Sequence, residues 1–154
     1  MSKKPSELFS SLGFLKSTYC KRGDVMENNL VTISSIIVAI IFVSLAIFQE
    51  LLTLGFPLAE FTLGGYYKIL PKKLRAISAI SSLILLFMAV VVLKHAKIFN
   101  GLDFLPSYVL MWIITIALGL MTLANFISQS KKEKYTMTPV SAVTFLLCLY
   151  ITLA

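Results

Sequence analysis

Acidic residues near the ends of long apolar runs are the first feature of this sequence that could support chemistry. Glu50 and Glu60 flank Gly55-Phe56-Pro57, and a partly dehydrated carboxylate there could hold a cation or a protonatable ligand. Lys68 and Arg75 follow, and a cation close to Glu60 would favour the charged form of both groups. The pattern predicts a binding lip at a membrane boundary. The simpler interpretation is a structured turn whose charged side chains extend to the lipid head groups.

The same turn contains Gly64 and Gly65, and a second polar cluster follows the third apolar run. Glycine pairs allow close backbone approach or a positive φ angle. The second cluster consists of Asn125, Ser128, Ser130 and Glu133. Asn125 and Ser128 are three residues apart and share one face of a helix, where they could hydrogen-bond to a neighbouring helix.

We expect these two clusters to pack against each other. Glu60 would then face Lys68, Arg75 or the segment 130–134, and the paired loops would form the recognition surface. Polar groups beside apolar helices favour this arrangement because they can satisfy one another away from lipid.

Residues for catalysis are sparse. His95 is the only histidine and has no acid or cysteine beside it, whereas a zinc site needs three or four ligands. A general acid–base role for it would lack a partner nucleophile. Cys148 lies within an apolar run, where a small packing residue is expected. The sequence therefore predicts no catalytic, cofactor-binding or metal-binding residues and no cofactor.

The composition identifies the environment in which these residues must work. Of 154 residues, 58% are hydrophobic and 14% are charged, and the mean hydropathy is +0.89. Soluble domains have about 25% charged residues, so the composition argues against an ordinary soluble domain. The excess of Leu, Ile, Val and Phe excludes a disordered chain. Two cysteines cannot form a disulfide framework. The net charge of +7 comes from basic residues beside apolar runs, which indicates contact with lipid head groups and not with nucleic acid.

Four apolar runs predict four membrane-spanning helices, over about residues 30–54, 76–94, 107–128 and 137–154. The expected fold is all-α: a polytopic membrane protein with four transmembrane helices in an antiparallel bundle. Gly55-Phe56-Pro57 should end the first helix, and Pro139 should occupy the first turn of the fourth. Residues 128–134 are expected to form the connection before that fourth helix.

Residues 1–25 differ from the membrane domain 26–154. This amino-terminal extension has five basic residues and only a weak apolar patch, which is typical of an interfacial amphipathic helix. A second interpretation is that it is not translated natively. The residues from Lys21 to Val25 can be encoded by a purine-rich sequence of the kind that precedes a start codon, so we expect Met26 to be the native start.

The distribution of positive charge predicts the orientation. The connections after the first and third helices carry seven Lys and Arg residues, whereas the opposite side carries two when residues 1–25 are excluded. Positively charged loops remain in the cytoplasm. We expect a multi-pass protein of the plasma membrane with both termini outside and both basic loops cytoplasmic. Tyr108 and Trp112 would lie in the outer aromatic belt.

Two motifs carry a resemblance to a known group. The first includes Pro57-Leu58-Ala59-Glu60 and Gly64-Gly65-Tyr66-Tyr67-Lys68, and the second runs from Asn125 through Ser130-Lys131-Lys132-Glu133 to Thr138-Pro139. Over about residues 26–154 the chain resembles small four-helix integral membrane proteins of Gram-positive bacteria. It departs from them at Phe56, where the group has alanine. The resemblance implies the topology and the importance of both motifs, and it implies no activity.

Three functions are compatible with these features. The first is a non-enzymatic binding or accessory protein that acts through its two cytoplasmic loops. Its partners would be the lipid bilayer and another membrane protein or a second copy of itself. The second is a small dimeric transporter in which Glu50 binds a cationic or protonatable molecule. The third is a lipid-modifying membrane enzyme, which is least expected because its acids lack a partnered histidine, metal or nucleophile.

Overall fold

The chain is all-helical over the residues that its computed structural model describes, which are 5–62, 66–99, 104 and 106–154. Side chains are described from Val25 onward. The elements in chain order are α1 (Pro5–Leu54), the 3-10 helix η1 (Ala59–Phe61), α2 (Lys72–His95), α3 (Ser107–Ile127) and α4 (Lys131–Leu153). No strand occurs in these described ranges.

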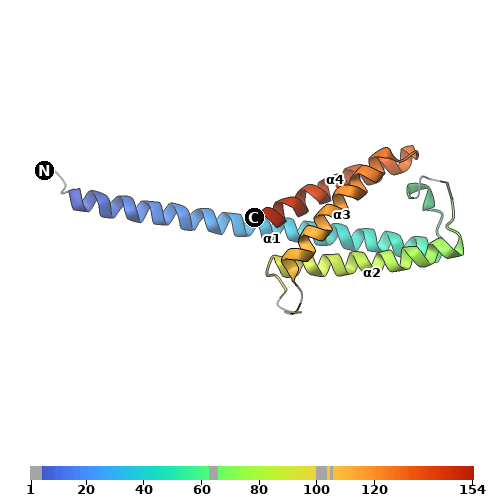
Figure 1. The fold of residues 1–154 in the computed structure, drawn as a ribbon, viewed down its shortest axis with the longest axis horizontal. Helices are drawn as coiled ribbons and strands as arrows, with labels where there is room; N and C mark the ends of the chain where they lie inside the picture. Colours follow the sequence, from blue (N-terminus) through green and yellow to red (C-terminus); the bar gives the residue numbers. More distant parts are fainter. Residues whose placement is uncertain (1–4, 63–65, 100–103, 105) are drawn as a thin grey trace.

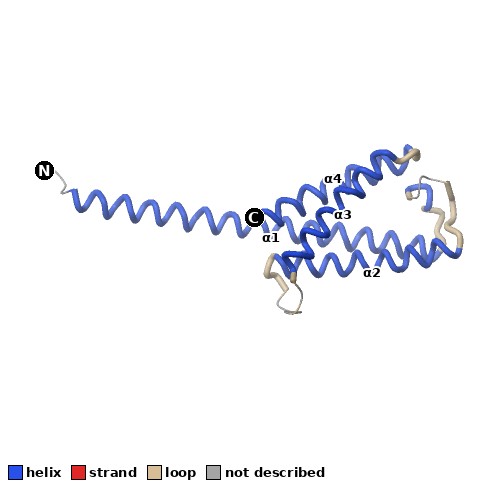
Figure 2. The backbone as a smooth tube through the Cα atoms, viewed as in Figure 1, coloured by secondary structure: helices blue, strands red, loops and turns tan. Residues whose placement is uncertain are grey.

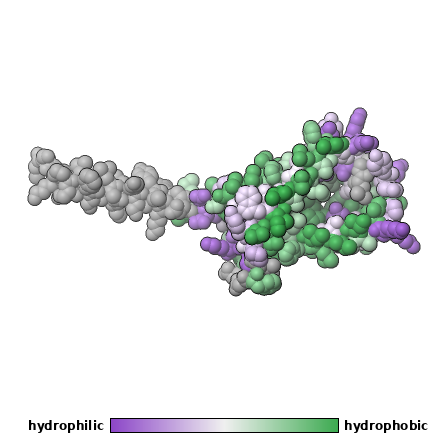
Figure 3. Space-filling model, in the orientation of Figure 1, coloured by the Kyte–Doolittle hydropathy of each residue, from purple (hydrophilic) through white to green (hydrophobic). Residues whose placement is uncertain are grey.

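Within the described residues, four helical segments are long and apolar enough to cross a membrane: Val25–Leu54, Lys72–His95, Ser107–Ile127 and Lys131–Leu153. Fewer than a third of the residues in each apolar window are buried inside the protein. Large aliphatic side chains cover the outer faces, and charged side chains gather toward the two ends of the bundle (Figure 3). The chain thus has the features of a multi-pass membrane protein.

The helix boundaries differ from the predicted ones at three places. α1 is one uninterrupted helix from Pro5 to Leu54, so the backbone does not break between the extension and the first apolar run. α2 begins at Lys72, directly after Pro71. α4 begins at Lys131 and not near 137, because Ser130 caps it by accepting a hydrogen bond from the Glu133 N–H.

Pro139 therefore lies inside α4, which corrects the prediction that it occupies the first helical turn. A proline in a helix removes one backbone hydrogen bond. Membrane helices accommodate this loss through neighbouring helices and nearby hydroxyl groups. The expected connection 128–134 shortens accordingly to three residues, 128–130.

Basic residues occupy the first turns of both α2 and α4. Lys72, Lys73 and Arg75 begin α2, and Lys131, Lys132 and Lys134 begin α4. The amino-terminal end of a helix carries partial positive charge, so lysines there are electrostatically unfavourable in isolation. This placement nevertheless agrees with the preference for positive charge on one side of a membrane.

The helices associate as two pairs. α1 packs along α2, and α3 packs along α4 (Figure 1). The two pairs meet around the carboxyl-terminal end of α4 and spread apart toward the connections that follow α1 and α3 (Figure 2). η1, in the connection after α1, contacts α4 and bridges the open end.

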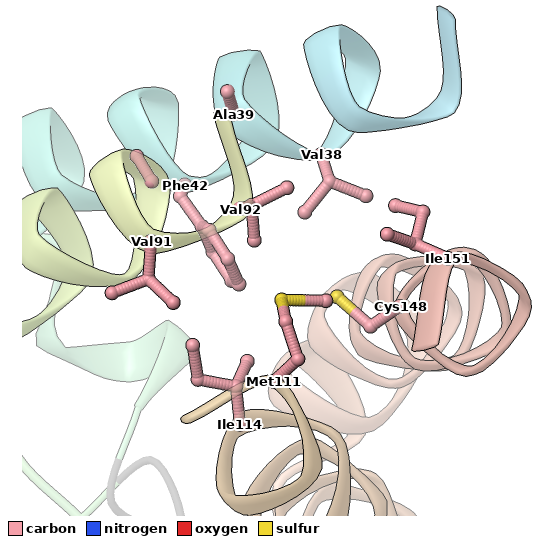
Figure 4. Packing of buried hydrophobic residues seen from close by; sticks show 10 residues of the cluster. Val38, Ala39, Phe42, Val91, Val92, Met111, Ile114, Cys148 and Ile151 are labelled. Atoms are coloured by element: carbon pink, nitrogen blue, oxygen red, sulfur yellow. The ribbon is translucent and has the colours of Figure 1, made fainter. Parts of the chain in front are cut away.

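All four helices contribute to a buried core where the pairs meet (Figure 4). Phe42 from α1 and Val92 from α2 are fully buried, and Met111 from α3 packs beside Cys148 from α4. The Thr115 and Thr152 hydroxyls lie 3.1 Å apart and join α3 to α4 in the same region. This core holds the two helix pairs together at one end of the molecule, and contacts of the connections hold them at the other end.

Candidate functional site

A cavity of about 430 Å³ lies between the α1/α2 pair and the α3/α4 pair. This volume falls within the range of about 300–1,000 Å³ typical of small-molecule sites. The face shown in Figure 3 is hollowed between the pairs. We call it the inter-pair cavity, and its lining residues are Leu45, Phe48, Gln49, Phe61, Thr62, Leu74, Ile77, Ser78, Ser81, Ile84, Leu85, Met88, Ala117, Leu118, Met121, Asn125, Glu133, Met137, Val140, Ser141 and Thr144.

The wall of the inter-pair cavity is mainly apolar, with a few polar side chains among the apolar ones. Toward the core its wall consists mainly of apolar side chains such as Leu85, Met88 and Leu118. Toward the connections the wall includes Gln49 and Glu133, from the last turns of α1 and the first turn of α4. A few polar groups in an apolar pocket typically fix the orientation of a bound molecule.

Asn125 and Ser141 form a polar link across the α3/α4 wall of the cavity. The Asn125 amide Nδ2 donates a hydrogen bond of 3.3 Å to Ser141 Oγ, and the Ser141 hydroxyl donates to the Thr138 carbonyl. Asn125 thus makes the predicted bond to a neighbouring helix. Ser128 instead donates to the Glu133 carboxylate, at the start of α4.

The connection between α1 and α2 contacts residues 129–132, around the start of α4. These contacts lie at the end of the molecule where the two helix pairs spread apart (Figure 2). Ser130 Oγ donates to the Glu60 carbonyl at 3.1 Å, and the Lys132 ammonium forms an ion pair with the Glu60 carboxylate. Tyr66 Oη donates to Gln129 Oε1 at 3.1 Å. We call this set the loop junction; its members are Glu60, Phe61 and Tyr66 on one side and Gln129, Ser130 and Lys132 on the other.

Electrostatics favour the charged form of Glu60 at the junction. The hydrogen bond from Lys132 and the positive charge of that ammonium hold the pKa of Glu60 below its ordinary value of 4.5. Partial burial acts in the opposite direction, and the charge of Lys68 adds a smaller lowering. Of the three partners predicted for Glu60, the structure brings it to the segment 130–134.

Arg75 has a structural role at the other side of the same connection. Its Nε donates to the Leu70 carbonyl at 2.9 Å, and its carbonyl accepts from the Thr53 hydroxyl. The guanidinium lies against Gly55, which ends α1 with a φ of +92°. A Cβ at Gly55 would be 2.7 Å from the guanidinium atoms. Glycine is required here both for the backbone angle and for the space.

Glu50 lies outside the inter-pair cavity lining. Its carboxylate accepts a hydrogen bond from the buried Ser82 hydroxyl, which ties the end of α1 to α2. Glu133 is the single ionisable residue among the described residues that line the cavity. The structure thus places Glu133 and not Glu50 in the cavity wall, and cation binding at Glu50 stays a prediction.

The other predicted residues have simpler positions. Lys68 is exposed in the connection before α2, and Gly64 and Gly65 lie outside the residues that the structure describes. Among the described residues no group of three or more His, Cys, Asp or Glu side chains could hold a metal ion.

Sequence reasoning missed the inter-pair cavity and the Tyr66–Gln129 contact. The cavity depends on the angle between the two pairs, which no local pattern reports. The capping of α4 did have a signal, since Ser130 and Glu133 have the Ser-x-x-Glu spacing of a capping box.

No family model, curated protein or solved structure matches this chain. The resemblance of its loop motifs to small four-helix proteins of Gram-positive bacteria stays a prediction. A functional proposal therefore depends on the geometry of the inter-pair cavity and the loop junction.

Proposed function

We propose that this protein is a non-enzymatic binding protein of the plasma membrane that holds a small molecule between its two helix pairs. In this proposal the four helices form an antiparallel bundle, both termini lie outside the cell, and the loop junction faces the cytoplasm. The observation that supports it most directly is the position of the loop junction, which joins the two connections at the mouth of the inter-pair cavity.

The loop junction would control access to the cavity. η1 supplies Phe61 to the cavity wall and Glu60 to the ion pair with Lys132. A movement of η1 that breaks the ion pair would therefore also shift the Phe61 side chain in the cavity wall. The core at the other end contains residues from all four helices and would stay packed while the connections separate. A molecule in the cavity would then be retained as long as the junction remains closed.

The test measures how fast an uncharged thiol reagent, N-ethylmaleimide, reaches the cavity. Met137→Cys provides a thiol in the cavity lining, and Thr136→Cys provides a control on an exposed position of the same helical turn. Both are placed in full-length protein in lipid nanodiscs, in a background with Cys20 and Cys148 replaced by alanine. Glu60→Lys would then place two positive charges at the junction.

The expected result is a several-fold faster reaction at Met137→Cys when Glu60→Lys is added, with no change at Thr136→Cys. The charge exchange Glu60→Lys with Lys132→Glu should restore the slow rate, because the ion pair forms again with reversed polarity. Equal rates at Met137→Cys with and without Glu60→Lys would contradict the proposal.

The orientation is tested in intact cells with a membrane-impermeant thiol reagent. Lys97→Cys should be labelled from outside, because it follows α2 on the side opposite the loop junction. Lys72→Cys should be labelled only after the membrane is permeabilised. Labelling of Lys72→Cys in intact cells would reverse the proposed orientation.

A transporter of a cationic or protonatable molecule is the second candidate function. A cavity between helix pairs, with one acidic residue near its mouth, is the observation that favours it. Glu133 would be the binding residue. Uptake into sealed vesicles that is lost in Glu133→Gln would support transport, whereas binding without uptake would support the binding protein.

A further inference from the structure

We propose that Pro139 is a hinge in α4, about which residues 131–138 swing away from η1 to open the loop junction. This proposal rests on the proposed binding function and specifies which part of α4 moves when the inter-pair cavity opens. It follows from the distribution of contacts along α4 and from the hydrogen bonding around Pro139.

The contacts of α4 fall into two groups, one on each side of Pro139. Before it, Lys132 pairs with Glu60, and Ser130, which caps the helix, donates to the Glu60 carbonyl. Four buried residues follow it, namely Thr144, Cys148, Ile151 and Thr152. The first part of α4 is therefore held at the loop junction, and the second part is held in the core.

The backbone hydrogen bonding of α4 is interrupted at the boundary between these two parts. Proline has no N–H, so the Tyr135 carbonyl lacks the donor that position 139 would otherwise supply. The Ser141 hydroxyl donates to the Thr138 carbonyl at 3.0 Å. Helices bend at prolines and where side-chain hydroxyls bond to backbone carbonyls, and both features meet here.

The side chain of Thr138, directly before the hinge, favours the open state. Among the described residues its Oγ1 is a buried atom without a hydrogen-bond partner. A buried hydroxyl without a partner costs free energy. A bend at Pro139 would let water or a freed carbonyl reach this hydroxyl, so the open state avoids a cost that the closed state carries.

A modest bend is enough to separate the loop junction. The segment 131–138 is about 12 Å long, so a bend of about 20° would move its first residue by about 4 Å. The hydrogen bond from Ser130 to Glu60 is 3.1 Å long and would be lost. The bond from Asn125 to Ser141 lies beyond the hinge and would keep α3 against α4.

The test measures whether opening of the loop junction needs Pro139. The probe is Gln49→Cys, which lies in the cavity lining on α1 and therefore away from the substituted proline. Labelling by N-ethylmaleimide is followed in lipid nanodiscs, with Cys20 and Cys148 replaced by alanine. The rates are compared with and without Glu60→Lys, which breaks the ion pair of the junction.

Glu60→Lys should accelerate labelling several-fold while Pro139 is present. Pro139→Ala should reduce that acceleration at least about threefold, because a complete set of helical hydrogen bonds resists bending. Val143→Ala changes an exposed residue one turn after the hinge and should leave the acceleration unchanged. Lys73→Cys, exposed in the first turn of α2, reports any general effect on the reagent.

Hydrogen exchange distinguishes a hinge from a general gain in stability. Pro139→Ala should slow amide exchange in residues 131–138 and leave residues 143–153 unchanged, because the core already holds the latter. Circular dichroism and gel filtration verify that each variant is folded.

Thr138→Val tests the hydroxyl without a partner. Valine has nearly the same shape and no donor, so the closed state should be favoured and labelling of Gln49→Cys should become slower. Thr144→Val is the matched control, because the Thr144 hydroxyl already donates to the Val140 carbonyl. This control should not slow the labelling.

Equal acceleration by Glu60→Lys with and without Pro139→Ala would overturn the hinge, and so would equal slowing of exchange in both parts of α4. Labelling in Thr138→Val that is no slower than in the parent would also contradict it. The proposed binding function fails separately, when Glu60→Lys does not change labelling in protein that retains Pro139. In that case hydrogen exchange still decides whether α4 bends at this position.

Discussion

The hydroxyl of Ser130 lies 3.1 Å from the carbonyl oxygen of Glu60, seventy positions earlier in the chain, and it also caps α4. Oγ donates to the Glu60 carbonyl and accepts from the Glu133 N–H at 3.3 Å. A hydroxyl has one donor hydrogen and two acceptor lone pairs, so both bonds form together. The start of α4 and the position of η1 thus depend on the same atom.

Replacing Ser130 separates these two roles. Ser130→Ala should lose both bonds and reduce stability by about 0.5–2 kcal/mol, the usual cost of removing a helix cap. Ser130→Asp should keep the cap but lose the bond to Glu60, because an ionised carboxylate has no hydrogen to donate. Hydrogen exchange at the amides of the first turn of α4 should therefore increase in Ser130→Ala and stay slow in Ser130→Asp. Equal exchange in both variants would mean that the cap does not start the helix.

The ion pair between Glu60 and Lys132 should make stability depend on pH. Since the folded-state pKa of Glu60 lies below 4.5, the pair contributes fully above that pH. Its contribution is lost as the pH falls through the lowered value. The difference in thermal unfolding temperature between the parent and Lys132→Gln should be constant from neutral pH to 4.5 and then shrink.

Lys134→Gln is the matched control for this measurement. The Lys134 ammonium lies over the Phe126 ring, which has no titratable group. The difference between the parent and Lys134→Gln should stay constant over the same pH range. If the Lys132→Gln difference were to grow in acid, the direction assigned to the Glu60 pKa would be wrong.

Gly55→Ala should destabilise the end of α1. A side chain in the left-handed region costs about 1–2 kcal/mol, and the added Cβ would also displace the Arg75 guanidinium. Gly119→Ala is the informative comparison, because Gly119 lies inside α3 and its Cβ would meet only the Phe145 ring at 3.2 Å. Unfolding in detergent should show a clear loss for Gly55→Ala and little change for Gly119→Ala.

The buried hydroxyl pair Thr115–Thr152 should contribute little to stability. Interhelical hydrogen bonds in membrane proteins average about 0.6 kcal/mol. Thr152 also donates to the Cys148 carbonyl at 2.7 Å, so Thr115→Val leaves that hydroxyl bonded. We expect a loss below about 1 kcal/mol on unfolding in detergent. A loss of several kcal/mol would show that α3 and α4 depend on this contact.

The number of helices and their helical character were predictable because each apolar run is long enough to span lipid and must satisfy its own backbone there. The end of α1 at Leu54 was predictable for a similar local reason, since Gly55 and Pro57 cannot continue a helix. The prediction of four long apolar helices is confirmed over the described residues.

The site was predictable only in part. The polar residues around Glu60 and around Ser130 indicated that the two connections would meet. The sequence could not distinguish Lys132 from Lys68 or Arg75 as the ionic partner of Glu60. That choice depends on where α4 begins and on how η1 lies against it. Glu50 and Glu133 are both acids near a helix end, and only the packing of the pairs places Glu133 in the cavity wall.

The lysines and arginine at the start of α2 and α4 would contact the lipid head groups if these helices span a bilayer. Each of these helices has cationic side chains at its partially positive end. A lipid phosphate can neutralise the side-chain charges and the partial charge of the helix end together. Lipids without net negative charge attract these cations less, so in a bilayer of such lipids part of that compensation would be lost and these turns would fray more often. The loop junction at this end would therefore stay closed for more of the time in a leaflet that contains more acidic phospholipid.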